Sequence, residues 1–232
     1  MSDKFEVFNV EKHKGQYVKV DANFSHIKDQ HVVPITPIEI AKVALNFPVC
    51  FMKSSDENPF KMVAILGLES GRNVFYNDGH FKAMYVPQHV KKHPFTLAKT
   101  PEGQVFLAVE TAALNTEKNG EALFDNVGEP SDYLIYKQVE LKELARQEEL
   151  STQFTSRLVE LGLLTECSFK FDLGDGQKKQ ISGLYSVDRD LLKSLDDESL
   201  LSLQKQGMLE AIYSHLVSLG QFQRVIDLSA NT

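Results

Sequence analysis

The order of segments along this chain predicts an α+β fold. Short apolar runs separated by turn residues fill the first half and are typical of strands, whereas apolar residues at helical spacing dominate the second half. Runs of strands followed by runs of helices favour an antiparallel sheet over a parallel one. We therefore expect an antiparallel meander sheet in the N-terminal half, packed against helices, and a mainly helical C-terminal half that carries one β-hairpin.

Three consecutive regions are expected within one integrated domain. Residues 1–34 predict an irregular or β-rich lead-in, residues 35–130 a sheet-rich region, and residues 131–232 a helical region with a hairpin near 168–185. A chain of 232 residues is long enough to bury a conventional core.

A short helix is predicted over residues 38–45. Thr36 suits the position before a helix and Pro37 the first helical position. Apolar residues cover most of the helix circumference, so we expect the helix to be buried. The nearly unbroken apolar run 61–68 predicts a central strand. Further strands are expected at 49–52, 73–76, 95–98 and 105–109, with a turn at 77–79 and a short helix at 87–93.

The second half predicts helices around one hairpin. Ser131 is a suitable N-cap for a long helix that ends near Gly162. Phe169 and Phe171 alternate with polar residues, as in a half-buried strand, and the glycines at 174 and 176 predict the turn of the hairpin. Short helices are expected after Asp188 and Asp196, and a terminal helix from Gly207 to Leu219.

Charge and hydropathy narrow the functional classes. The net charge of −7 argues against nucleic-acid binding through phosphates and against a polybasic membrane anchor. No run of about 18 apolar residues predicts a membrane span. The N-terminus lacks a signal-peptide pattern, so we expect a cytoplasmic protein, with leaderless export left open.

Cys50 and Cys167 are expected to be buried thiols, and a disulfide requires that the fold bring them together.

The histidines do not form a complete reactive motif. His89 and His93 have the spacing of a zinc-binding pair on a helix, but valine follows His89 where a zinc hydrolase carries its glutamate, and spacing identifies no third ligand. A surface or capping role is therefore preferred for this pair. His215 lies next to the apolar stripe of the terminal helix, which favours a partly buried, hydrogen-bonded histidine over a general base.

Two apolar segments in polar surroundings are harder to interpret. One contains Phe124 and Asp125, and the other, residues 81–87, contains Tyr85 and Pro87. Either segment could pin a loop to the sheet or line a groove for an extended peptide. The candidate binding residues are Tyr85, Pro87, His89, His93, Phe124, Asp125, Tyr185, Tyr213 and His215, with no catalytic residue, metal ligand or cofactor predicted.

A set of short segments together resembles the bacterial SapC family, which is named after a protein linked to paracrystalline surface layers. The resemblance extends over about residues 30–220 and implies a soluble protein without a settled enzymatic activity, so it supplies no catalytic residues. The matching segments are NFPV (46–49), YVP (85–87), KHPF (92–95), LFD (123–125), GEP (128–130), GLYSVD (183–188), IYSHL (212–216) and SL (218–219).

Three hypotheses about function follow. The leading one is a non-catalytic binding or accessory protein that recognises a peptide or protein partner, because unexplained apolar segments occur without a reactive motif. The second is an enzyme or cofactor-dependent accessory factor whose site is dispersed in the sequence. The third is a structural component of a surface layer. Self-association into a homo-oligomer stays open.

Overall fold

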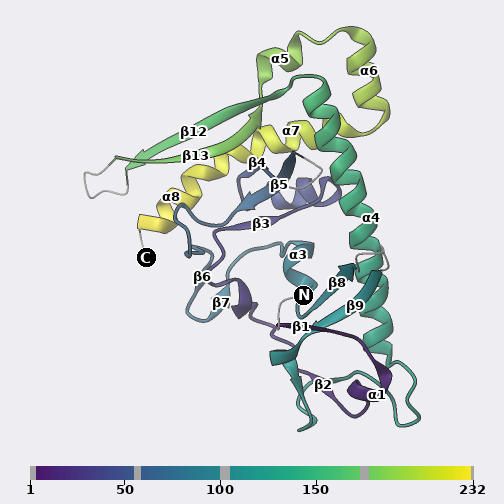
Figure 1. The fold of residues 1–232 in the computed structure, drawn as a ribbon. Coiled ribbons are helices and arrows are strands. Elements are labelled where there is room, and N and C mark those ends of the chain that lie inside the picture. The colour runs from purple at the N-terminus through teal and green to yellow at the C-terminus, as the bar shows by residue number, and fades with distance from the viewer. Residues whose placement is uncertain (1–3, 55–58, 100–104, 173–177, 231–232) are drawn as a thin grey trace. The chain divides into compact units, whose positions relative to one another are not determined.

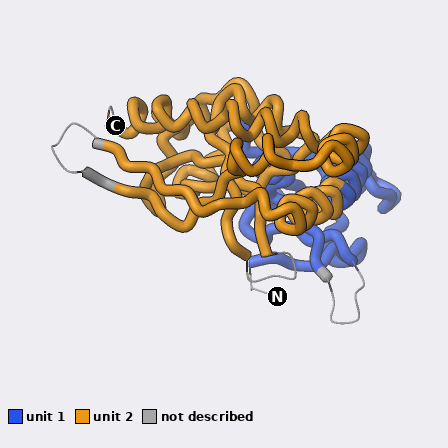
Figure 2. Tube along the Cα trace, turned by 90° about the horizontal axis from the view of Figure 1, so that it is seen from above, with its two compact units in different colours: residues 1–22, 89–146 blue, residues 23–88, 147–232 orange. Residues whose placement is uncertain are grey.

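The computed structural model describes residues 4–54, 59–99, 105–172 and 178–230 (Figure 1). The α+β prediction is confirmed, because the described strands pair antiparallel and the C-terminal half is mainly helical. The chain divides into two compact units that interleave along the sequence (Figure 2). Unit 1 comprises residues 1–22 and 89–146, and unit 2 comprises residues 23–88 and 147–232.

Unit 1 contains two small sheets. Their strand orders are β1-β9-β8 and β10-β2-β11. The bounds are β1 (Phe5–Val7), β2 (Tyr17–Val18), β8 (Phe95–Lys99), β9 (Val105–Glu110), β10 (Leu114–Asn115), β11 (Glu121–Ala122), α1 (Val10–His13), α3 (Gln88–Lys91), η3 (Thr111–Ala113) and α4 (Asp132–Glu160), of which α3 begins and α4 ends in unit 2.

The core of unit 1 joins its sheets to the first half of α4. Leu134 and Leu141 supply the stripe from α4, and Phe95 and Val109 lie in the same cluster. Phe124 belongs to this cluster and is only 6% exposed, and its ring centroid lies 5.6 Å from that of Phe8. The apolar segment that interrupts a polar connection therefore packs into a core.

Unit 2 is built on a five-stranded sheet of order β12-β13-β4-β5-β3. The predicted central strand, β5, pairs with a neighbour on each side. The bounds are β3 (Val32–Pro34), β4 (Val49–Lys53), β5 (Phe60–Ile65), β6 (Tyr76–Asn77), β7 (His80–Phe81), β12 (Leu164–Asp172), β13 (Lys178–Val187), η1 (Ser25–Ile27), η2 (Pro37–Glu39), α2 (Ile40–Val43), α5 (Arg189–Lys193), α6 (Asp197–Lys205), α7 (Met208–Ser218), η4 (Leu219–Gln221) and α8 (Phe222–Ala230).

One face of this sheet brings the two cysteines together. Cys50 and Cys167 belong to the same apolar cluster, with Leu184 and Phe222, and both are free thiols. The hydrogen bond with Cys167, together with burial, raises the pKa of the Cys50 thiol. Cys50 is fully buried as expected, whereas Cys167 is only partly buried.

The structure changes three sequence expectations about the elements, and a fourth falls outside the described residues. The strand expected at 73–76 shrinks to β6, which pairs with β7 around a turn where Asp78 and Gly79 have φ values of 52° and 77°. Such values are those of a type I′ turn. Helix α8 was not predicted, although Phe222, Val225 and Ser229 bury one face at helical spacing. The helix at 87–93 is shorter, Gln88–Lys91, and the predicted hairpin turn at 174–176 lies outside the described residues.

The segment 38–45 was expected to form a buried helix, but it is buried on one side only. Ile40 and Val43 are buried, but Ile38 is 53% and Leu45 is 62% exposed. An apolar surface helix is unusual, because helices that are apolar all round are normally enclosed. The structure therefore leaves apolar side chains on η2 and in the turn after α2 open to solvent.

Truncation of Phe124 should test its assignment to the core. We expect Phe124→Ala to lower the free energy of unfolding by about 3–5 kcal/mol, the usual cost of removing a buried phenylalanine ring. Chemical denaturation measures this value. Phe106→Ala, at a ring that is 38% exposed, is the control and should cost much less. Equal effects of the two substitutions would contradict the assignment.

Candidate functional site

The imidazole of His215 lies between strands β4 and β13. These strands pair at Leu184 with Met52 and at Tyr185 with Phe51, and the same register would place Val187 opposite Val49. Instead, the Val187 amide donates to His215 Nε2 at 3.1 Å, and His215 Nδ1 donates to the Val49 carbonyl at 2.8 Å. A side chain of α7 thus replaces a hydrogen bond of the sheet.

These contacts fix His215 as a neutral imidazole with its proton on Nδ1. Burial lowers its pKa to about 4, although the hydrogen bond to the Val49 carbonyl opposes the shift. The Ser186 hydroxyl is 3.2 Å from Nε2, so a serine does lie within reach. However, the same Nε2 accepts from the Val187 amide, and His215 is fully buried. The arrangement suits cross-linking of strands better than proton transfer to a substrate.

Ser218 completes the attachment of α7 to β4. Its hydroxyl accepts a hydrogen bond from the Val49 amide at 2.9 Å and donates to the His215 carbonyl at 2.6 Å. Val49 at the start of β4 therefore has both backbone groups paired with side chains of α7.

The Tyr85 hydroxyl points to a buried carboxylate. It donates to Glu39 Oε2 at 2.8 Å, and the Gln88 amide donates to the same oxygen at 3.0 Å. The other oxygen of Glu39 accepts from the Thr36 amide at 3.1 Å, which makes the capping box of η2. Burial, followed by the charge of Glu39, raises the pKa of Tyr85. These bonds hold the segment before α3 against η2, and Pro87 is buried there.

His89 and His93, whose spacing would suit a zinc-binding pair, have different partners. His93 Nε2 lies 2.7 Å from Glu110 Oε2, whereas His89 Nδ1 lies 3.3 Å from the Lys92 ammonium. Lys4 binds the other oxygen of Glu110 at 3.0 Å. Burial disfavours the charged form of Glu110, but the hydrogen bonds from Lys4 and His93 outweigh it and lower the pKa of the carboxyl. No group of three histidine, cysteine, aspartate or glutamate side chains among the described residues could hold a metal ion.

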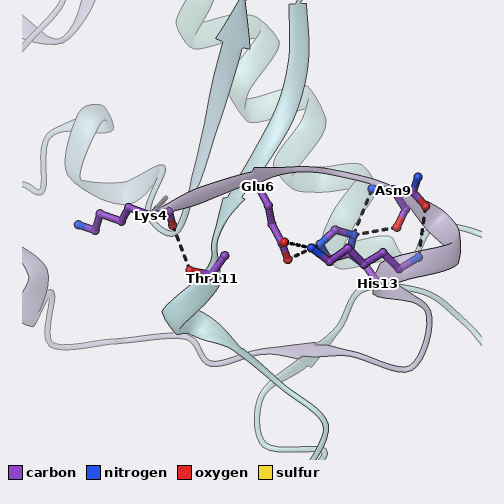
Figure 3. A network of polar contacts seen from close by, with 6 residues as sticks. Lys4, Glu6, Asn9, His13 and Thr111 are labelled. Carbon is purple, nitrogen blue, oxygen red and sulfur yellow. Dashed lines mark hydrogen bonds and ion pairs between the residues drawn. The ribbon is translucent and has the colours of Figure 1, made fainter. Parts of the chain in front are cut away.

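Sequence reasoning missed a second histidine–carboxylate pair, which involves His13 (Figure 3). His13 is fully buried, with Nε2 at 2.9 Å from Glu6 Oε1 and Nδ1 at 2.8 Å from the Asn9 carbonyl. Hydrogen bonding by Lys12 and His13 lowers the pKa of Glu6 despite the opposing effect of burial. No sequence signal identifies the pair, because β1 and α1 bring the two side chains together only after folding.

Most of the remaining candidate binding residues contact other parts of their own unit. The Asp125 carboxylate accepts amide hydrogen bonds from Val127, Gly128 and Glu129 at 2.8–2.9 Å, so it organises its own loop. The Tyr185 ring packs edge-on against Phe60, with centroids 4.8 Å apart. Tyr213, in contrast, is 52% exposed on α7.

Exposed apolar side chains occur on η2, on α7 and in segments next to them, and α2 packs against α7. The Met84 amide donates to Asn46 Oδ1 at 3.1 Å, which places Met84 beside the end of α2. We call the following five residues the α2–α7 surface: Ile38, Leu45, Met84, Tyr213 and Val217, which are 53%, 62%, 80%, 52% and 71% exposed. Tyr213 is the one named candidate among them, and Met84 lies in the segment 81–87 that was expected to pin a loop or line a groove. The helix around Ile38 and Leu45 was expected to be buried.

The chain has a clear family match. Residues 8–225 match the model of the SapC family, which agrees with the resemblance found in the sequence. No curated protein and no solved structure matches the chain. Among the described residues, no helix is long and apolar enough to cross a bilayer.

The buried imidazole predicts a specific pH dependence of stability. His215 has a pKa of about 4 in the folded chain and an ordinary value of 6.5, so only the unfolded chain is protonated between these limits. Its contribution should be complete above about pH 6.5 and should fall by about 3 kcal/mol as the pH drops towards 4. Urea denaturation at several pH values measures the slope. Because His215→Gln cannot titrate, its slope should be shallower, and equal slopes would refute the prediction.

The bond from Tyr85 to Glu39 should also be measurable. We expect Tyr85→Phe to lower the free energy of unfolding by about 1–3 kcal/mol, because a buried carboxylate oxygen loses one of its donors. Tyr213→Phe is the matched control, since its ring is 52% exposed, and it should change stability by less than about 0.5 kcal/mol. Equal effects of the two hydroxyl deletions would contradict this role of Tyr85.

Proposed function

The chain belongs to the SapC family, and we propose that it is a non-catalytic binding protein that recognises a protein partner through the α2–α7 surface. The observation that carries this proposal is the exposure of five large apolar side chains on neighbouring elements. Single exposed apolar residues are ordinary on soluble proteins, but neighbouring ones are typical of interaction sites.

The spacing of the exposed apolar residues near α2 and on α7 suits a helical partner. Ile38, Ala41 and Leu45 are exposed at steps of three and four along η2, α2 and the turn that follows α2. Tyr213 and Val217 are exposed one turn apart on α7. Two apolar stripes on packed helical elements can receive the apolar face of an amphipathic helix. Met84 adds a flexible side chain that adapts to the shape of a ligand.

Charged residues beside these two apolar stripes indicate which charges a partner helix should carry. Lys42 is exposed within the first stripe, and Glu210 is exposed one turn before Tyr213 in the second. A partner helix with an acidic residue near Lys42 and a basic residue near Glu210 complements both charges. We therefore propose an amphipathic helix of a partner protein as the occupant.

The contacts of the histidines favour binding over catalysis. His215 cross-links two strands, and His93 pairs with a carboxylate that also binds Lys4. The candidates Tyr85, Phe124 and Asp125 support loops and a core, so the proposal rests on exposed residues instead.

Site-specific photo-crosslinking tests the proposal. A photoreactive amino acid at position 217, in chains produced in the native host, should form a covalent adduct with one partner that mass spectrometry identifies. The control probe at position 201 replaces a leucine of α6 that is 53% exposed. An identical set of adducts from both positions would argue against the α2–α7 surface.

Binding of the identified partner then provides the quantitative test. We expect Leu45→Glu to raise its Kd at least about tenfold, because a charge replaces an apolar contact. Leu201→Glu is the matched control and should leave the Kd unchanged. The same Kd for both variants would refute the assignment of the surface.

A further inference from the structure

Strand β12 forms one edge of the five-stranded sheet and pairs only with β13 within the described part of the chain (Figure 1). It spans nine residues, Leu164–Asp172, and is therefore long for an edge strand. Backbone amides and carbonyls along such an edge form a ready template for another strand. β12 is thus a candidate interaction surface separate from the α2–α7 surface.

The irregularity of this hairpin lies in β13 and not in β12. Cys167 pairs with Leu184 and Phe169 with Ile181, so Ser182 and Gly183 oppose the single residue Ser168. Gly183 has a φ of 77°, which the extra residue of such a bulge requires. Proteins often interrupt an exposed edge strand with a bulge to prevent pairing. Here the exposed edge strand is the regular one.

Side-chain exposure supports a regular strand. Glu166, Ser168 and Lys170 are exposed on one face, whereas Cys167 and Phe169 on the other face are partly buried. The alternation continues through Ser168 without a change of phase, as expected for a strand without a bulge. The exposed face of β12 therefore carries an acid, a hydroxyl and a base in a fixed order.

We infer that β12 pairs antiparallel with β12 of a second copy of the chain, around a two-fold axis at Ser168. In this register, Glu166 of each copy lies opposite Lys170 of the other copy, because the two residues are equally distant from Ser168. Opposite charges directly across an antiparallel pair stabilise it. A two-fold axis places the same contact at both ends of the strand pair.

Other registers lose this match. An axis at Cys167 opposes Glu166 to Ser168 and leaves both charges without a counterpart. An axis midway between two residues places each exposed residue of one strand opposite a partly buried residue of the other. A parallel, in-register pair opposes Glu166 to Glu166 and Lys170 to Lys170. The order of charges therefore selects the second copy as occupant and Ser168 as the centre.

The consequence is a dimer with one continuous sheet. Each copy contributes its five-stranded sheet, and the new strand pair joins them edge to edge. Edge charges normally discourage sheet extension, and a single sign on this strand would do so. Because Glu166 and Lys170 are complementary about Ser168, they favour this one pairing and oppose the others.

Analytical ultracentrifugation with charge-swap variants tests the inference. The wild-type chain of 26.2 kDa should show a monomer–dimer equilibrium that depends on concentration. Lys170→Glu sets two carboxylates opposite each other, and Glu166→Lys sets two ammonium groups opposite each other. Each variant should therefore raise the dimer Kd by roughly tenfold or more. The double swap of Glu166→Lys with Lys170→Glu restores both pairs and should restore the dimer.

A mixture of the two single variants gives the sharpest test. One strand is then wholly acidic and the other wholly basic at these positions, so the mixture should form a heterodimer although neither variant dimerises well alone. Lys205→Glu on α6 is the matched control for net charge and should dimerise like the wild type. Circular dichroism checks that every variant is folded.

Three results would overturn the inference. The first is a wild-type chain that stays monomeric up to its highest soluble concentration. The second is a Lys170→Glu variant that dimerises like the wild type, which would place a dimer contact elsewhere. The third is a mixture of single variants that forms no heterodimer.

Discussion

The attachment of β13 to β4 depends on one buried imidazole. Only two residue pairs join these strands directly, and beyond them His215 receives the Val187 amide and donates to the Val49 carbonyl. Strands that separate inside a core leave backbone groups that must find other partners, because an unpaired buried amide is costly. Since β12 pairs only with β13 in the described chain, this contact with α7 helps to hold the whole hairpin on the sheet.

A buried carboxylate has a comparable role elsewhere in the same unit. Glu39 closes the capping box of η2 and binds the segment before α3 through Tyr85 and the Gln88 amide. Ile38, Leu45 and Met84 are exposed in the same region, beside the charged side chain of Lys42.

Most residues that look functional in the sequence do not face solvent in the structure. Histidines 13, 93 and 215 all bind carboxylates or backbone groups of their own unit. Phe124 packs a core, and Asp125 holds a loop. The surfaces that remain for recognition are an apolar helical face and a strand edge with ordered charges. Both are suited to contacts with other protein chains, which is consistent with a binding role for this SapC-family member.

The sequence by itself determined the α+β class, the central strand, the long helix α4 and the hairpin, because these depend on local periodicity and on turn and cap residues. It also identified the SapC family. Only the tertiary structure decided that Leu45 is exposed while Phe124 is buried, since both occur in apolar segments and burial depends on packing between distant elements. The same holds for His215, whose partners at Val49 and Val187 are 166 and 28 residues away. Local patterns predict which element a residue joins, but its partners are set by long-range contacts.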